Sequence, residues 1–334
     1  MNVLLTSVGR RAYMVKYFKD AIGPEGQVHV CNSDDATVAF YYADKSVVSP
    51  LIYSEQYIPF LLDYCKENQI DLLLSLFDID LLVLAQNKEK FAAIGTRVIV
   101  SDAELVGICN DKWKTYLFLK ENGFAVPKTY PNLHKVMLAL ERGEISYPVV
   151  VKPRFGCGSI ALSIAEDEMS LLYYYTRNNR AIKDTYLKYE SSTVEEKIIF
   201  QECLRGQEYG ADIINDLDGN YQNSIVKKKL AMRAGETDIA ELMDVPEIRK
   251  ETERLGKLTG HIGNMDCDVF LVDGKPYILE MNARFGGGYP FSQMGGCNLP
   301  GAIVAWCRGE TPSSSMLTAR TGVRGYKELY ITEA

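Results

Sequence analysis

The chain has 334 residues and a net charge of −7, with 47% hydrophobic and 24% charged residues. This composition is ordinary for a globular protein of two or three domains, and the acidic balance argues against a nucleic-acid-binding platform. Only three widely separated histidines occur, so neither a zinc cluster nor a histidine-based triad is expected. No apolar run approaches the ~20 residues that span a bilayer, and the start does not resemble a secretory signal. We therefore expect a cytoplasmic protein with reduced, mostly buried cysteines and no nucleic-acid or membrane partner.

Apolar runs of strand length alternate with helical patterns over the first hundred residues. Strands are expected at 3–8, 27–31, 46–48, 71–77 and 97–100, and helices after Tyr13 and at 36–43, 55–67 and 81–91. This alternation predicts a parallel sheet with helices on both faces and ligands at the carboxyl ends of its strands. The fingerprint G-x-G-x-x-G is absent after the first strand, which disfavours a nicotinamide-dependent dehydrogenase.

Charged residues stand at two of these strand ends, in segments 7–11 and 77–80. Asp78 or Asp80 could hold a substrate ammonium group there, and Arg10 or Arg11 a carboxylate. The alternative is that they are loop caps and surface charges.

The pattern changes after residue 101. Helices are expected at 102–110, 112–122, within 166–196 and at 244–260, and strands at 147–153, 160–164, 198–204, 209–215 and 221–229.

Segment 266–288 predicts two short strands around a turn at 273–275. Placing Val272 opposite Pro276 carries Asp268 to a position directly across from Glu280. Opposed residues have Cβ atoms roughly 5 Å apart. The two carboxylates are therefore expected side by side.

Residues two apart in a strand share a face, so Glu280, Asn282 and Arg284 are expected together. The other face is expected to carry Leu279, Met281 and Ala283. With Asp268, the first face offers two carboxylates and an amide oxygen, which suit Mg²⁺. Arg284 could hold a phosphate oxygen, and the glycines at 286–288 would let backbone approach a ligand. A solvated strand face followed by a flexible glycine loop is the alternative.

A lysine followed by a glycine-rich loop lies between the strands at 147–153 and 160–164. Lys152 ends the first strand, and Gly156, Gly158 and Ser159 are small enough to fold over phosphates with backbone N–H groups pointing inward. The loop is not a Walker A sequence, and a plain β-hairpin with a surface lysine is the alternative.

The segment around Gln201 suits a nucleoside. The backbone of Glu202, Cys203 and Leu204 could pair with adenine, and Glu208 could accept two ribose hydroxyls. The alternative is an edge strand with a solvated glutamate.

A basic cluster at 227–229 and Arg233 stands out in this acidic chain. It follows a strand, so it is either an anion site or a solvated charged face.

The order of these motifs, beginning with Lys112 before a helix and ending with D-x₁₁-E-x-N-x-R, resembles the ATP-grasp superfamily. It is most similar to single-module relatives of the carbamoyl-phosphate synthase large subunit and biotin carboxylase. The resemblance implies an α/β and α+β chain with three parts. These are a Rossmann-like pre-ATP-grasp domain (1–100), a small lobe with its preceding helices (101–205) and a large lobe carrying the metal site (206–334).

The resemblance also implies roles for individual residues. Lys112 and Lys152 would bind ATP phosphates under the glycine loop, Gln201 to Leu204 adenine, and Glu208 ribose. Asp268, Glu280 and Asn282 would bind magnesium, although the family usually has glutamate or glutamine where Asp268 stands. Arg284 would lie beside the transferred phosphate, and Lys228 and Arg233 near the acyl phosphate or substrate carboxylate.

The activity implied is an ATP-dependent carboxylate–amine ligase that uses two Mg²⁺ ions, with Mn²⁺ as a substitute. Its partners would be a small-molecule carboxylate and an amine, and its assembly a homodimer. Two alternatives stay open: bicarbonate activation, as in carbamoyl-phosphate synthesis or carboxylation, and a non-catalytic ATP-binding regulatory subunit.

Overall fold

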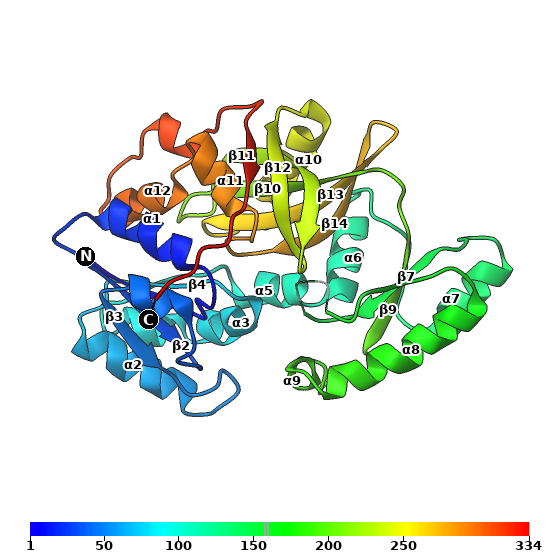
Figure 1. Cartoon of the computed structure of the whole chain (residues 1–334), viewed down its shortest axis with the longest axis horizontal. Helices are drawn as coiled ribbons and strands as arrows, with labels where there is room; N and C mark the ends of the chain where they lie inside the picture. The colour runs from blue at the N-terminus through cyan, green and yellow to red at the C-terminus, as the bar shows by residue number, and fades with distance from the viewer. Residues whose placement is uncertain (157, 159, 334) are drawn as a thin grey trace.

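The computed structural model describes residues 1–156, 158 and 160–333. Within these residues the strands form a five-stranded, a four-stranded and a six-stranded sheet. The predicted fold class, an α/β part followed by an α+β part, is confirmed. The four-stranded sheet and its helices form an arm that extends from the other two sheets (Figure 1).

The first sheet is entirely parallel, in the strand order β3-β2-β1-β4-β5. Its elements are β1 (Asn2–Thr6), α1 (Ala12–Ile22), β2 (Gln27–Asn32), the 3₁₀ helix η1 (Val38–Tyr42), β3 (Lys45–Val48), α2 (Tyr57–Glu67), β4 (Leu72–Ser75), α3 (Asp78–Gln86), α4 (Lys88–Ala92) and β5 (Arg97–Ile99). Successive residues of β1 face opposite layers. Val3 and Leu5 belong to the core that α1 supplies, and Leu4 to the core of α2 and α3.

Two of the predicted helices differ in this region. The helix expected at 81–91 is two helices that meet at Asn87, and the first of them begins at Asp78. The helix expected at 36–43 is the shorter η1. As a result, Asp78 and Asp80 lie in the first turn of α3 and not in a loop.

The arm is an antiparallel sheet in the order β6-β9-β7-β8. Its elements and the two helices before it are α5 (Ala103–Asn110), α6 (Lys112–Glu121), β6 (Thr129–Tyr130), α7 (Leu133–Glu141), β7 (Val149–Pro153), β8 (Ser163–Ala165), α8 (Glu168–Lys183), α9 (Leu187–Glu190) and β9 (Ile198–Glu202). A reciprocal capping box between Asp167 and Ser170 starts α8. α8 packs Leu171 against Val149 and Val151 of β7. Val150 and Lys152 alternate with these residues along β7 and therefore face away from the helices.

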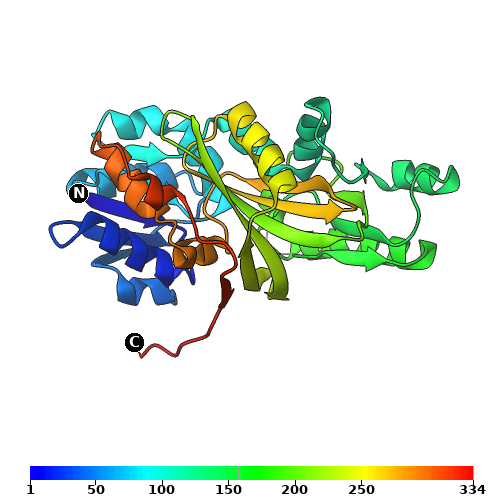
Figure 2. The ribbon, with the colours of Figure 1, turned by 90° about the horizontal axis from the view of Figure 1, so that it is seen from above.

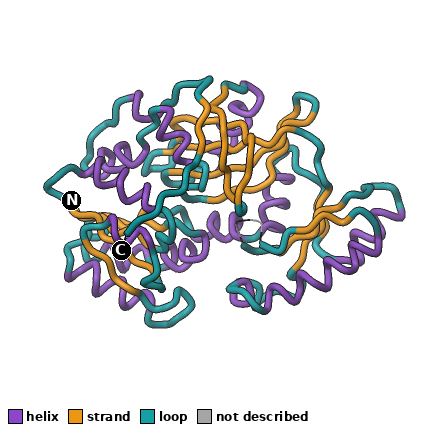
Figure 3. The backbone as a smooth tube through the Cα atoms, viewed as in Figure 1, coloured by secondary structure: helices purple, strands orange, loops and turns teal. Residues whose placement is uncertain are grey.

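The six-stranded sheet is antiparallel in the order β14-β13-β10-β11-β12-β15. Its elements are β10 (Gln207–Asn215), β11 (Tyr221–Arg233), β12 (Glu236–Met243), α10 (Pro246–Thr259), β13 (Asn264–Val272), β14 (Lys275–Asn282) and β15 (Arg324–Tyr326). One face is apolar and packs against α5, α6 and α10, as Leu105, Leu119 and Ile248 show. The other face has a polar part, which carries Lys229 and Asp268, and an apolar part, whose Ile214, Ile225 and Leu242 join the core of the N-terminal sheet. Figure 3 shows these strands at the centre with helices outside them.

The last helices return to the N-terminal sheet. α11 (Tyr289–Gly295), α12 (Leu299–Cys307) and the 3₁₀ helix η2 (Ser314–Leu317) follow β14. Ile303 and Val304 of α12 share a core with Val3 and Met14, so α12 covers the same face of the parallel sheet as α1. After β15 the chain end extends outward (Figure 2), and Thr332 forms a hydrogen bond with Tyr42 of η1.

Two further expectations from the sequence concern membrane-spanning helices and the state of the cysteines. None of the described helices combines the length and the apolar character that crossing a membrane requires. The described cysteines are free, and most are buried.

Candidate active site

A cavity of about 500 Å³ lies between the arm and the polar face of the six-stranded sheet. Most of the predicted site residues line it: Lys112, Lys152, Gly156, Gly158, Gln201, Glu202, Cys203, Leu204, Glu208, Asp268, Glu280, Asn282 and Arg284. Ser159, also predicted, lies outside the described residues. Residues separated by up to 172 positions, from Lys112 to Arg284, thus face one space.

Asp268 and Glu280 are directly opposed on β13 and β14, as predicted. The predicted turn was wrong by one residue, because Val272 faces Lys275 and not Pro276. A bulge at Leu279 restores the register before Glu280. Leu279 was predicted on the strand face opposite Glu280. Because of the bulge, it instead lines the cavity together with Glu280, and this part of the prediction was wrong.

Two lysines balance the opposed carboxylates. Lys112 Nζ lies 3.2 Å from Glu280 Oε1, and Lys229 Nζ lies 2.6 Å from Asp268 Oδ1. Lys229 also contacts Glu208 Oε1 at 2.7 Å. Burial raises the pKa of Asp268 to about 6, with Lys229 opposing this and the nearby Asp266, Glu208 and Glu280 adding to it. These carboxylates therefore concentrate negative charge on the wall of the cavity that the six-stranded sheet forms.

This wall fits a hard divalent cation. Asp268, Glu280 and Asn282 offer only oxygen ligands, and the crowding of carboxylates is what a cation would relieve. Among the described residues no group of three or more His, Cys, Asp and Glu side chains is arranged to hold a metal ion. The proposed ligands include only two side chains of these types, Asp268 and Glu280, because Asn282 is not counted. The observation therefore does not contradict the fit.

Lys152 lies on the opposite wall. Its side chain is 6% exposed, and its Nζ donates to Gln201 Oε1 at 2.9 Å. Burial lowers the pKa of Lys152 to about 8, although Glu280 and Asp268 partly oppose the shift. An anion such as phosphate beside Lys152 would raise this pKa again and favour the protonated ammonium group.

Lys112 is placed by a set of contacts at the start of α6. Asp111 caps the helix by accepting from the backbone N–H groups of Trp113 and Lys114. Arg154 donates to both carboxylate oxygens of Asp111, at 2.7 and 2.6 Å. The Lys112 ammonium group donates to the carbonyl oxygen of Gly156. The first lysine and the glycine loop are therefore held together.

The predicted adenine edge is shorter than expected, because β9 ends at Glu202. The N–H of Glu202 donates to the carbonyl of Lys128 at 2.8 Å, and its side chain accepts from the N–H of Lys128 at 3.1 Å. That N–H is therefore not available to a ligand, which corrects part of the prediction. Cys203 and Leu204, beyond the strand end, are the better candidates.

Arg284 joins this wall to the N-terminal sheet. It is 8% exposed, and its guanidinium donates to Asp78 Oδ2 at 2.8 Å and to Asp266 Oδ2 at 3.2 Å. Burial alone would raise the pKa of Asp78, but Arg284 outweighs it and holds that pKa below its usual range. Asp78 is therefore an arginine partner.

Asp80 is structural, which overturns its suggested contact with a substrate. It is fully buried and accepts hydrogen bonds from Thr6 at 2.8 Å, Ser7 at 2.9 Å and Tyr57 at 3.0 Å.

Comparison with known proteins decides the family. The model of the ATP-grasp domain matches residues 109–288, and the model of the PylC-like N-terminal domain matches residues 3–99. The chain belongs to the ATP-grasp family. The carbamoyl phosphate synthase large chain of Pseudothermotoga lettingae is 24% identical over 277 residues, which cover 79% of this chain and 23% of that protein. The chain thus spans about a quarter of that curated relative.

Solved structures show the same ATP-grasp fold. One is the biotin carboxylase domain dimer of 2-oxoglutarate carboxylase from Hydrogenobacter thermophilus, in complex with MgADP, ADP and bicarbonate. It has a TM-score of 0.73 and 16% identity, covering 97% of this chain and 73% of that chain. The other is an L-amino acid ligase from Bacillus licheniformis, with a TM-score of 0.71 and 17% identity, covering 99% and 81% of the two chains.

The two remaining predicted residues of this ATP-grasp chain are not among those that line the cavity. Lys228 lies between Lys227 and Lys229 on β11 and so points to the opposite face. Arg233 pairs with Asp238 and is 43% exposed. Their catalytic roles stay predictions that this placement does not support.

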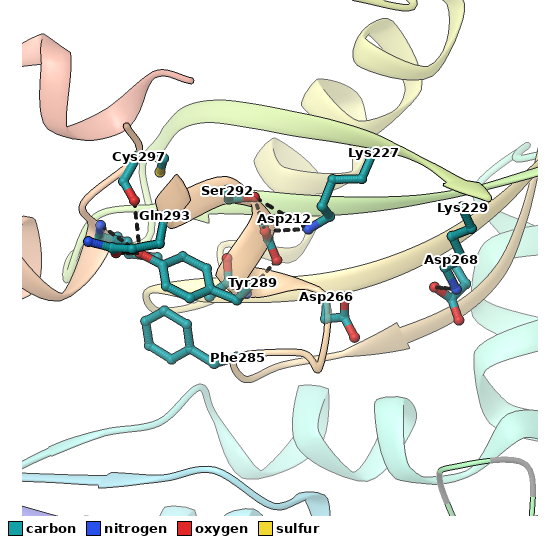
Figure 4. A network of polar contacts seen from close by, with 12 residues as sticks. Asp212, Lys227, Lys229, Asp266, Asp268, Phe285, Tyr289, Ser292, Gln293 and Cys297 are labelled. Atoms are coloured by element: carbon teal, nitrogen blue, oxygen red, sulfur yellow. Dashed lines mark hydrogen bonds and ion pairs between the residues drawn. The ribbon is translucent and has the colours of Figure 1, made fainter. Parts of the chain in front are cut away.

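The sequence analysis included Lys227 in the basic cluster but assigned the catalytic role to Lys228, and it missed Asp212. Lys227 lines the cavity and pairs with Asp212, which is fully buried and also accepts from Ser292 Oγ at 2.5 Å. Figure 4 shows Lys227 directed at Asp212, and Lys229 directed at Asp268. Strand alternation was the available signal, since it places residues 227 and 229 on one face and 228 on the other.

Proposed function

We propose that the chain is an ATP-dependent ligase that activates a carboxylate as an acyl phosphate and joins it to an amine, releasing ADP and phosphate. The observation that carries the proposal is the shared cavity. Lys112 and Lys152 lie in it with the opposed carboxylates Asp268 and Glu280, and with Arg284. Cations for phosphates and oxygen ligands for a metal are what phosphoryl transfer requires.

In this proposal different residues of the cavity bind the adenine, the ribose and the phosphates of ATP. Cys203 and Leu204 bind the adenine through backbone groups, and Glu208 binds the ribose. Lys112 and Lys152 hold the phosphates, with Gly156 and Gly158 supplying backbone. The proposal keeps the division into a pre-ATP-grasp domain at 1–100 and two lobes at 101–205 and 206–334, and the three separate sheets support it.

Asp268, Glu280 and Asn282 would hold Mg²⁺, with two ions as the expected number and Mn²⁺ as a substitute. The MgADP in the Hydrogenobacter structure supports a divalent ion. Bound Mg²⁺ would offset phosphate charge during transfer. A cation held by these ligands would take over the charge balance that Lys112 and Lys229 now supply, and Lys112 would be available to phosphate.

The reaction then has two balanced steps. A carboxylate oxygen of the substrate attacks the γ-phosphorus, and the bond from that phosphorus to the bridging oxygen breaks, leaving ADP and an acyl phosphate. The amine nitrogen next attacks the acyl carbon, loses a proton, and expels phosphate to form the amide. Arg284 would stabilise the tetrahedral oxyanion that the amine attack forms, and its buried position on the cavity wall supports this role. The arm covers the cavity and would exclude water from the acyl phosphate.

Bicarbonate is a second candidate for the activated acid. The carbamoyl phosphate synthase relative and the bicarbonate in the Hydrogenobacter structure favour it. In either case the partners would be small molecules. The cytoplasmic location stays a prediction, and so does the homodimer, which the dimeric Hydrogenobacter domain supports.

The test is release of ADP and phosphate from MgATP across a panel of amino acids, small carboxylates and bicarbonate, with hydroxylamine present to trap an acyl phosphate. A hydroxamate that appears with one organic acid supports the ligase. Bicarbonate-dependent ADP release without any hydroxamate favours the second candidate. Tight ATP binding without turnover on any acid would contradict both and indicate a regulatory subunit.

A further inference from the structure

The cavity continues beyond the phosphate and metal residues to an end lined by Arg11, Glu236 and Gly287. Arg11 comes from the segment between β1 and α1, Glu236 opens β12, and Gly287 follows β14. The end therefore combines the parallel sheet with the six-stranded sheet. None of the nucleotide roles proposed above uses these three residues.

Arg11 is a cation that lines this end, and its charge acts on the carboxylates of Asp78 and Glu236. Its guanidinium donates to the carbonyl oxygen of Leu76. No ion pair formed by the described residues includes Arg11, whereas Lys227 pairs with Asp212 and Arg284 with Asp78. A guanidinium that lines a cavity in this way is suited to receive a carboxylate through a two-point fork.

Glu236 is a carboxylate with room for a second partner. It accepts from Lys327 Nζ at 3.0 Å, and its side chain remains 36% exposed. A carboxylate has about four acceptor positions, so one lysine does not saturate it. Gly287 keeps the space beside it open, because a Cβ there would lie 3.1 Å from the Glu236 carboxyl carbon.

The phenol oxygen of Tyr13 lies behind this end and is not among the groups that line the cavity. It is buried, and no described residue hydrogen-bonds to it. Burial raises the pKa of Tyr13 to about 12, with Arg11 opposing and Glu236 adding to the shift, so the hydroxyl keeps its proton.

We propose that this end of the cavity is the binding site for the acyl substrate, and that the substrate is an α-amino acid. Arg11 binds its carboxylate and Glu236 binds its ammonium group. In an α-amino acid one carbon separates the two charged groups, so the cation and anion that recognise them must be neighbours. Arg11, Glu236 and Arg284 line one cavity, and the charge of Arg11, after that of Lys327, helps to hold the pKa of Glu236 below its usual range against burial. The inference rests on the proposed ligase function.

The first experiment measures hydroxamate formation with MgATP and hydroxylamine for the standard L-amino acids and for des-amino acids of matched shape, such as propionate for alanine. The wild type should favour the amino acid by at least about a hundredfold in kcat/KM, because the des-amino acid leaves Glu236 without its ligand. Glu236→Gln should remove most of that preference by lowering kcat/KM for the amino acid only. Arg11→Lys should raise KM for the acid and leave the Kd of ATP unchanged. Arg177→Lys, at an exposed arginine of α8 that does not line the cavity, is the control and should behave as wild type.

Two results separate this inference from the proposed function. Hydroxamate formed from des-amino acids as readily as from amino acids, with Glu236→Gln unchanged, would overturn the amino-acid site and keep the ligase. If no acid gives a hydroxamate, calorimetric titration of the amino acids into protein saturated with a non-hydrolysable ATP analogue still tests the site. Binding that Arg11→Lys weakens supports it, and no binding by the wild type overturns it.

Discussion

Asp268 lies directly opposite Glu280, although the hairpin that joins them is not the one that the sequence predicts. The turn is formed by Asp273 and Gly274 alone, both with positive φ (49° and 77°), as in a two-residue type I′ hairpin. That tight turn shifts the pairing by one residue, and the bulge at Leu279 shifts it back. The two carboxylates of the proposed metal site therefore depend on both irregularities.

Glu280→Gln should reduce ATP turnover by at least about a hundredfold, because the neutral amide lacks the negative charge that would bind the metal ion and that holds Lys112. The side chain keeps its shape, so the melting temperature should change little. Steady-state ADP release measures the loss. Glu241→Gln, which breaks a surface pair with Arg324, is the control and should keep full turnover.

ATP affinity should depend on pH through Lys152, whose pKa burial lowers to about 8. Phosphate favours the protonated ammonium group, so binding takes up a proton above that pH. Affinity should be constant below pH about 8 and fall above it by up to about tenfold per unit. Calorimetric Kd values from pH about 7 to about 9.5 would show this. In Lys152→Arg the fall should disappear, and a wild-type profile without any fall would be incompatible with a lysine–phosphate contact.

Much of this site could be read from the sequence, because strand alternation and motif order are local signals. Lys152, Glu280 and Asn282 each stand in a strand whose period fixes which side chains share a face. Asp212 could not be assigned, since its burial depends on Lys227 and on Ser292, 80 positions away. The packing of α12 on the parallel sheet was hidden for the same reason. The bulge at Leu279 carries no glycine or proline to signal it.

Gly235→Ala should weaken ATP binding by hindering the glycine loop. The added Cβ would lie 2.3 Å from the carbonyl oxygen of Gly158, so the hairpin between β11 and β12 could no longer meet the loop. The expected result is a higher KM for ATP. Gly143→Ala, also at positive φ but with nothing within 4 Å, is the control for backbone strain alone. Equal effects of the two variants on KM would argue against a role for the contact.

Tyr53 should help to hold the arm against the N-terminal sheet. Its ring stacks on Tyr189 with centroids 4.3 Å apart, and its hydroxyl donates to Glu190 at 2.9 Å. Tyr53→Ala removes a contact of about 1 kcal/mol, so the arm should open more often and KM for ATP should rise severalfold. Limited proteolysis should also cut 184–197 faster. Tyr41→Ala, on the exposed surface of η1, should leave both unchanged.

The central claim is that a carboxylate oxygen attacks the γ-phosphorus at this cavity. The direct measurement is oxygen transfer from an ¹⁸O-labelled acid substrate, with MgATP and hydroxylamine, followed by mass analysis of the released phosphate. The account predicts ADP and phosphate that carries one ¹⁸O atom from the acid in each turnover. Unlabelled phosphate, or label in AMP with release of pyrophosphate, would contradict an acyl phosphate intermediate.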